Sequence, residues 1–177
     1  MKKHLFNTLL SVSLLTAGLG SLSLAAAENA PAPAILAQDG DKDIPAAMMN
    51  EAKAYYIENA VIGFKVGFKL GGMPLPEEKT AAFKMAVTNW LEQEFLPFMA
   101  ANGILKEWVE MQFSPEVKDF NKRCANAGSM DDFMKIAQET EAYTKEHYPR
   151  SYSVLKSPDC RDVMLKLQNA MIRIMTE

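Results

Sequence analysis

The chain has 177 residues, with 19 lysine and arginine side chains, 22 acidic side chains and a formal net charge of −3. Binding to nucleic acid is not expected of such a mildly acidic chain, because phosphate contacts need clustered lysine or arginine. For the same reason, contact with an anionic membrane surface is not expected.

Residues 1–27 have the layout of a secretory signal peptide. Lys2 and Lys3 give a positive start, and the apolar stretch from Leu5 to Leu24 contains no acidic or basic residue. Small residues up to Ala27 then predict cleavage after that position. We therefore expect export, either to the periplasm or out of the cell. The 150 residues that remain contain 17 basic and 22 acidic side chains, a formal charge of −5.

The part after the signal peptide divides into a leader and one domain. Residues 28–43 are rich in alanine, proline and charge and lack an amphipathic period, which predicts a flexible leader. From residue 44 to residue 177 the pattern is helical, and no segment shows the sustained alternation of a strand. We predict a single all-α domain, an irregular and mostly antiparallel bundle of five or six helices.

Turn-forming residues divide the helical pattern. Pro97 is expected to bend or stop its helix, because proline has no N–H to donate and clashes one turn back. Serine, proline and an acid stand twice in the order that favours a helix start, at Ser114-Pro115-Glu116 and at Ser157-Pro158-Asp159. The expected helices are 44–70, 77–96, 104–112, 114–126, 129–148 and 157–175.

Small residues recur every fourth position near the end of the first expected helix. Gly63, Gly67 and Gly71 form a narrow ridge, with Phe64 and Phe68 beside it. An interior glycine costs about 1 kcal/mol relative to alanine, and close approach of another helix is the usual compensation. That helix belongs either to the same domain or to a second chain. Insertion into a bilayer is a third interpretation, although charged residues interrupt every window long enough to span. These five residues are the candidate interaction face.

The chain has two cysteines, Cys124 and Cys160. An even number in an exported chain predicts a disulfide between them, with two buried free thiols as the alternative. Each cysteine lies on the apolar stripe of its helix, so the two are expected to meet in the core. In the loop-entropy description such a cross-link contributes about 3–4 kcal/mol. A zinc site is not expected, because there is no Cys-x-x-Cys pair.

One row of polar residues offers candidate chemistry. Glu139, Tyr143 and His147 follow one another at four-residue spacing, and such a row can bind a metal or move a proton. A simpler interpretation is that a histidine in the last helical turn interacts favourably with the carbonyl end of the helix dipole. No nucleophile and base can be paired from the sequence. We therefore expect no catalytic residue, no metal and no cofactor.

Twelve methionines and an aromatic content of 9% leave the binding role open. Methionine fills cores, forms adaptable binding surfaces and can ligate copper(I). We expect a non-catalytic exported protein that binds another protein, or itself, through the glycine–phenylalanine face. The alternative is a carrier of an apolar small molecule in a cavity lined by methionine and aromatic residues, and an enzyme of unidentified chemistry is the third reading. No transmembrane segment is expected after the signal peptide.

Overall fold

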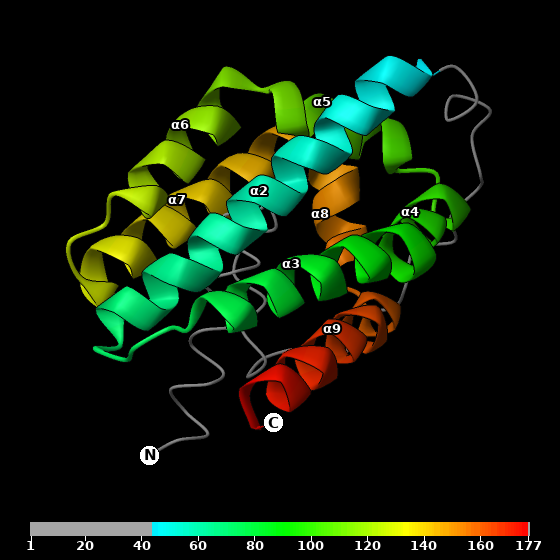
Figure 1. Cartoon of the computed structure of the whole chain (residues 1–177). Helices are drawn as coiled ribbons and strands as arrows, with labels where there is room; N and C mark the ends of the chain where they lie inside the picture. The colour runs from blue at the N-terminus through cyan, green and yellow to red at the C-terminus, as the bar shows by residue number, and fades with distance from the viewer. Residues whose placement is uncertain (1–43, 177) are drawn as a thin grey trace.

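The computed structural model describes residues 44–176, and all regular secondary structure in this range is helical (Figure 1). The prediction of an all-α fold is thereby confirmed, but residues 44–176 contain more helices than the five or six that were expected. The predicted signal peptide (1–27), the predicted leader (28–43) and Glu177 lie outside the described residues. In chain order the elements are α2 (Ala46–Leu70), α3 (Glu77–Trp90), the π-helical turn η2 (Leu91–Phe95), α4 (Leu96–Ala101), α5 (Leu105–Phe113), α6 (Pro115–Ala125), α7 (Met130–His147), α8 (Pro149–Leu155) and α9 (Pro158–Thr176).

The helix starts follow the capping chemistry that the sequence indicates. The Ser114 hydroxyl accepts a hydrogen bond from the Val117 N–H at 3.4 Å, and the Ser157 hydroxyl accepts one from the Cys160 N–H at 3.2 Å. Each bond satisfies one of the N–H groups that a helix leaves unpaired in its first turn. Tyr148-Pro149 was expected only to end a helix, whereas in the structure the proline also begins α8.

The helix does not stop at Pro97. Helices α3 and α4 form one continuous rod through η2, where the Leu96 N–H donates to the Leu91 carbonyl, five residues back instead of four. A π-helical turn widens the backbone, which lets the chain pass a proline that cannot donate a hydrogen bond and whose ring crowds the preceding turn. The rod ends near Gly103, whose φ of 61° suits glycine.

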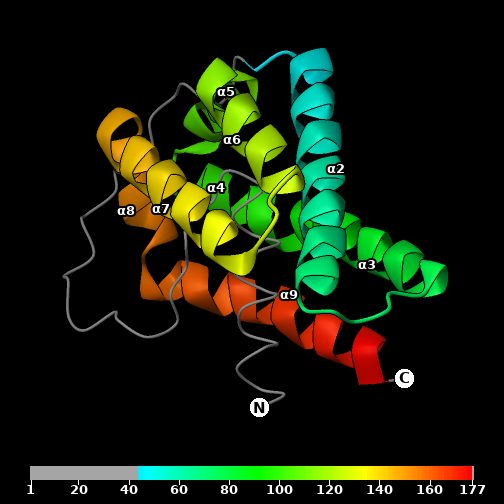
Figure 2. The ribbon, with the colours of Figure 1, turned by 90° about the vertical axis from the view of Figure 1, so that its left-hand side faces the viewer.

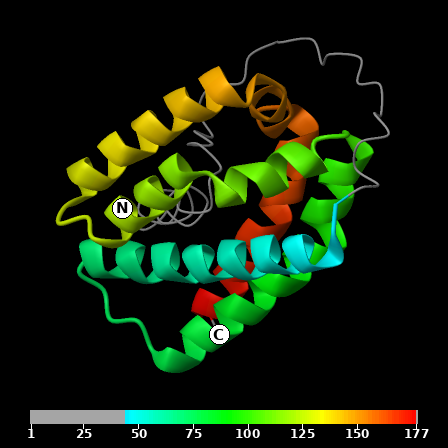
Figure 3. The same cartoon turned by 90° about the horizontal axis from the view of Figure 1, so that it is seen from above.

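The interior contains two clusters of buried apolar residues, and α2 contributes to both. The larger cluster joins one face of α2 to α3, η2, α4, α5, α8 and α9. The smaller one joins the opposite face of α2, around Val66, to α6 and α7. Figure 3 shows α2 between the α6–α7 pair on one side and α3 on the other. Helix α9 runs antiparallel along α3 (Figure 2), since Lys79 reaches the Ile174 carbonyl and Trp90 the Val163 carbonyl.

The two cysteines are free thiols, so the predicted disulfide is wrong. Each thiol does point inward, as the apolar stripes predicted: Cys124 is 1% exposed and Cys160 is fully buried. They belong to different clusters, however, because α6 packs on α2 and α7 whereas α9 packs along α3.

Among residues 44–176, no helix combines the length and the hydropathy that a membrane crossing requires.

Candidate binding groove

The groove lies where the chain turns from α2 into α3. The aromatic rings of Phe64 and Phe83 stack with their centroids 4.1 Å apart and their planes at 12°, and this contact holds the two helices together. The connecting loop begins with hydrogen bonds from the Gly71 N–H to the Gly67 carbonyl at 2.9 Å and from the Met73 N–H to the Phe68 carbonyl at 3.0 Å. The Phe64–Phe83 contact therefore joins α2 to α3 close to this loop. The groove lies beside this contact, and neither of the two rings is part of its lining.

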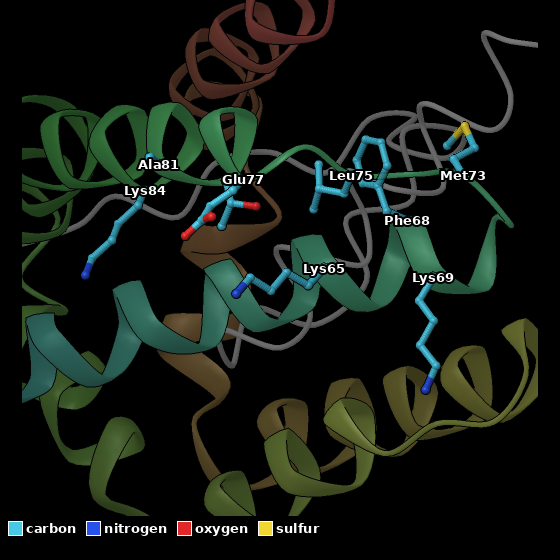
Figure 4. Close-up of a pocket in the computed structure, with 9 residues that line it drawn as sticks. Lys65, Phe68, Lys69, Met73, Leu75, Glu77, Ala81 and Lys84 are labelled. Atoms are coloured by element: carbon cyan, nitrogen blue, oxygen red, sulfur yellow. The ribbon is translucent and has the colours of Figure 1, made fainter.

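The groove is open to solvent and has a volume of about 520 Å³. Its apolar part comes from Phe68 of α2 and from Met73 and Leu75 of the loop (Figure 4). Phe68 is 3% exposed and belongs to the larger cluster, so its position is fixed by the core. The complete lining is Lys65, Phe68, Lys69, Met73, Leu75, Glu77, Thr80, Ala81 and Lys84.

The charged side chains of the groove are mostly cationic. Lys65, Lys69 and Lys84 are exposed, and within residues 44–176 no carboxylate forms an ion pair with any of them. Glu77 is the carboxylate in the lining. Other lysines of the chain do have glutamate partners, as in the pairs Lys53–Glu92, Lys156–Glu141 and Lys166–Glu94.

The candidate interaction face is largely inside the molecule. Phe64 is 1% exposed, Gly63 and Gly67 are buried, and Gly71 is half-buried. A methyl group at Gly71 would stand 3.2 Å from the Gly67 carbonyl oxygen, so a side chain at this position would be crowded. Of the five residues, Phe68 is the one that lines the groove.

The predicted row of Glu139, Tyr143 and His147 does not act as a unit. Glu139 accepts a hydrogen bond from Arg123 at 2.6 Å. The His147 ring stacks on the Tyr143 ring with centroids 4.2 Å apart, and its Nδ1 lies 3.1 Å from the Tyr143 carbonyl. This is the arrangement expected of a histidine that closes the last turn of a helix.

Tyr143 instead contributes to the start of α6. Its hydroxyl donates to the Glu116 carboxylate at 3.1 Å, and the Ser114 hydroxyl donates to the same oxygen at 2.8 Å. The hydrogen bond from Ser114, followed by those from the Glu116 backbone and Tyr143, lowers the pKa of the Glu116 carboxyl. The cluster fixes the contact between α6 and α7.

The centre of the larger cluster is aromatic and contains two polar atoms without partners. The Tyr56 and Trp108 rings have centroids 5.6 Å apart, and Trp90 and Phe95 lie beside Tyr56. The Tyr56 hydroxyl and the Trp108 indole nitrogen are buried and have no hydrogen-bond partner within the described residues. Burial raises the pKa of the Tyr56 hydroxyl far above its usual range.

Burial also raises the pKa of both thiols, Cys124 and Cys160, to about 12. The thiolate is the nucleophilic and metal-binding form of cysteine, so both side chains are chemically quiet near neutral pH. In the described part of the chain, no group of three or more histidine, cysteine or acidic side chains is placed to hold a metal ion.

The groove was not predicted from the sequence. The available signal was the pair of phenylalanine and lysine that occurs twice, at Phe64-Lys65 and at Phe68-Lys69. The second wall, formed by Glu77, Thr80, Ala81 and Lys84, depends on how α3 folds back against α2, and the residue pattern does not contain that information.

No known protein family, curated protein or solved structure matches the chain. The geometry and the charge of the groove therefore carry the functional argument.

Proposed function

We propose that the chain is an exported, non-catalytic binding protein that holds an anionic ligand in the groove between α2 and α3. One observation carries the proposal: Lys65, Lys69 and Lys84 line a groove that also has an apolar part, and none of them forms an ion pair with a carboxylate of residues 44–176. An ammonium group without a partner is available to a ligand at no cost in broken ion pairs. Both thiols are protonated near neutral pH, and the His147 ring stacks on Tyr143. Both observations support a binding role in preference to a catalytic one.

Charge alone would give weak binding. An exposed ion pair contributes about 0.2–1 kcal/mol and is screened by salt. Apolar contact contributes about 25 cal/mol for each Å² removed from water, so the floor of Phe68, Met73 and Leu75 has to take part. The expected ligand therefore carries both a negative charge and an apolar surface.

A fluorescent aromatic sulfonate, anilinonaphthalene sulfonate, provides the test because its emission rises when it leaves water. We expect the double variant Lys65→Gln/Lys84→Gln to bind this probe about tenfold more weakly at low salt. The control is Lys122→Gln/Lys135→Gln, which removes the same charge from exposed lysines outside the groove. Equal binding by the two double variants would reject the groove as the site.

Association with another protein, or with a second copy of the chain, stays a prediction. Phe64 does not offer such a contact in its observed position, because α3 and the core cover it. Light scattering on the purified protein measures self-association directly. If the mass rises with concentration and the double variant Lys65→Gln/Lys84→Gln abolishes this rise, the groove binds a second copy of the chain and not a small ligand.

A further inference from the structure

The groove is divided along its length into a charged end and an apolar end. Figure 4 shows Lys65 and Lys84 at the open end, with Glu77 between them. Phe68, Leu75 and Met73 lie toward the closed end, where the loop joins the two helices. In the same view Lys69 extends away from α3. Charge and apolar surface are therefore separated.

We propose that the ligand is an amphiphilic monocarboxylate, with its alkyl chain on Phe68, Leu75 and Met73 and its carboxylate between Lys65 and Lys84. The inference rests on the proposed function and adds the chemical class of the ligand. A separated site fits a molecule with one charged head and one apolar tail, because each part then meets a surface of its own kind. A ligand with charge along its whole length would place anionic groups on the apolar floor.

The charge of the open end favours a monoanion. Lys65 and Lys84 supply two positive charges and Glu77 supplies one negative charge. A single carboxylate neutralises the remainder, whereas the second charge of a phosphate monoester would face Glu77. Two negative charges that lie close together oppose binding.

The volume sets the size of the ligand. At about 520 Å³ the groove lies within the range of roughly 300–1,000 Å³ that is usual for small-molecule sites. A medium-length alkyl chain occupies such a space, and full burial of one methylene strengthens binding by up to about fourfold. Affinity should therefore rise with chain length until the chain passes the end of the loop.

Titration calorimetry on the purified protein tests the class with four ligands. Octanoate should bind, and butanoate should bind at least about tenfold more weakly because it lacks most of the apolar chain. Octanol and octylammonium match the chain of octanoate without its negative charge, so both should also bind more weakly. Binding of octylammonium as tight as that of octanoate would overturn the proposal.

Glu77 and Glu78 provide a matched pair for the head group. Glu77 lines the groove and its neighbour Glu78 does not, while both are exposed and both lie in the first turn of α3. Glu77→Gln should tighten octanoate binding about threefold, because it removes a like charge. Glu78→Gln should leave it unchanged. Equal effects of the two changes would show that only the overall charge of the protein matters, and this would count against the proposed placement of the head group.

Methyl NMR on methionine locates the tail. Met73 lines the closed end, whereas Met85, on the outer face of α3, is 65% exposed and does not line the groove. Octanoate should shift the Met73 methyl signal and acetate should not, with the Met85 signal constant in both titrations. The variant Met73→Leu assigns the signal. An unchanged Met73 signal at saturating octanoate would contradict the proposed orientation.

The outcomes separate this inference from the proposed function. If the aromatic sulfonate needs Lys65 and Lys84 but octanoate does not bind, the monocarboxylate is wrong and the anion-binding groove stands. If neither ligand depends on the two lysines, both proposals fail. Sedimentation with phosphatidylglycerol vesicles completes the test. No binding is expected of this acidic chain, and lysine-dependent binding would assign the charged end to a lipid surface instead of a free monocarboxylate.

Discussion

The indole N–H of Trp90 donates to the main-chain carbonyl of Val163 at 2.8 Å, and this hydrogen bond joins α3 to α9. Trp108, which packs in the same cluster, is fully buried, and its indole nitrogen has no hydrogen-bond partner among residues 44–176. The two tryptophans of the chain therefore differ in whether the indole N–H forms a hydrogen bond, and substitution of each one measures the effect of this difference on stability.

Trp90→Phe should destabilise the fold more than Trp108→Phe. Both changes remove ring volume, but Trp90→Phe also removes a hydrogen bond, which contributes about 0.5–1.5 kcal/mol. Trp108→Phe removes a buried donor without a partner, and the relief of its desolvation cost offsets part of the lost packing. Urea unfolding followed by circular dichroism gives the two free energies. Equal losses would mean that the Trp90–Val163 bond contributes nothing measurable.

Reducing agent should not change the unfolding temperature, because the cysteines form no disulfide. Iodoacetamide should leave both thiols unmodified in the folded protein and label both after unfolding, since Cys124 and Cys160 are buried. Mass spectrometry of the protein purified from its own compartment measures this directly. If the protein were two hydrogens lighter than the mass expected for two free thiols, and if reductant lowered its unfolding temperature, the cysteines would form a disulfide after all.

Alkaline pH should destabilise the protein through these thiols. The pKa of each is about 12 in the folded chain against an ordinary value of 9.0, so the unfolded chain loses its thiol protons first. The stability that burial of the neutral thiols provides is therefore complete below pH 9 and is lost as the pH rises from 9 to 12. The slope should approach about 1.4 kcal/mol per pH unit for each thiol. Cys124→Ala should make the slope of the unfolding free energy shallower over this range.

Two glycines outside the helices should respond differently to alanine. Gly72 has a φ of +65° with no atom within 4 Å of an added methyl group, so Gly72→Ala should cost about 1–2 kcal/mol through backbone strain alone. Gly128 does not have a left-handed φ, and its nearest atom would be the Asp132 carboxylate oxygen at 3.7 Å. Gly128→Ala should be neutral or stabilise by about 0.4–1 kcal/mol, because it restricts the unfolded chain. Thermal unfolding of the two variants makes the comparison.

Tyr143→Phe should raise the pKa of the Glu116 carboxyl toward its ordinary value. Hydrogen bonds from Ser114, the backbone and Tyr143 favour the ionised form, and the variant removes the third of these. A lowered pKa stabilises the folded protein at pH values above the ordinary pKa of the carboxyl, and this stability is lost as the pH falls. The stability of the variant should therefore decrease less in acid than that of the unchanged protein. Carbon-13 NMR of the carboxyl during a pH titration measures the shift. An unchanged pKa would show that the tyrosine hydroxyl does not reach the carboxylate in solution.

Local chemistry predicted much of the fold. The starts of α6 and α9 follow from serine, proline and an acid in that order, and Gly71-Gly72 correctly marks the end of α2. The apolar stripes of α6 and α9 correctly predicted which side chains point inward. These features depend on residues within one or two turns of each other, which is why a single sequence contains them.

Relations between distant helices were not predictable in the same way. A stripe shows that Cys124 and Cys160 point inward but not into which cluster, and that choice depends on which helices pack together. Pro97 was expected to bend or stop its helix, and the sequence gives no sign of the wider turn that accommodates it. The groove has the same origin, since its lysines come from two helices whose pairing is a tertiary property.

Helix α2 contributes one face to each of the two core clusters, and this shapes how the molecule loses its structure. If the segment around Val66 unfolds, α6 and α7 lose the surface against which they pack. The opposite face of the same helix, which contains Phe64, then loses its packing as well. Slow amide exchange should therefore report a single cooperative unit, in which the central helix and its neighbours on both flanks open together.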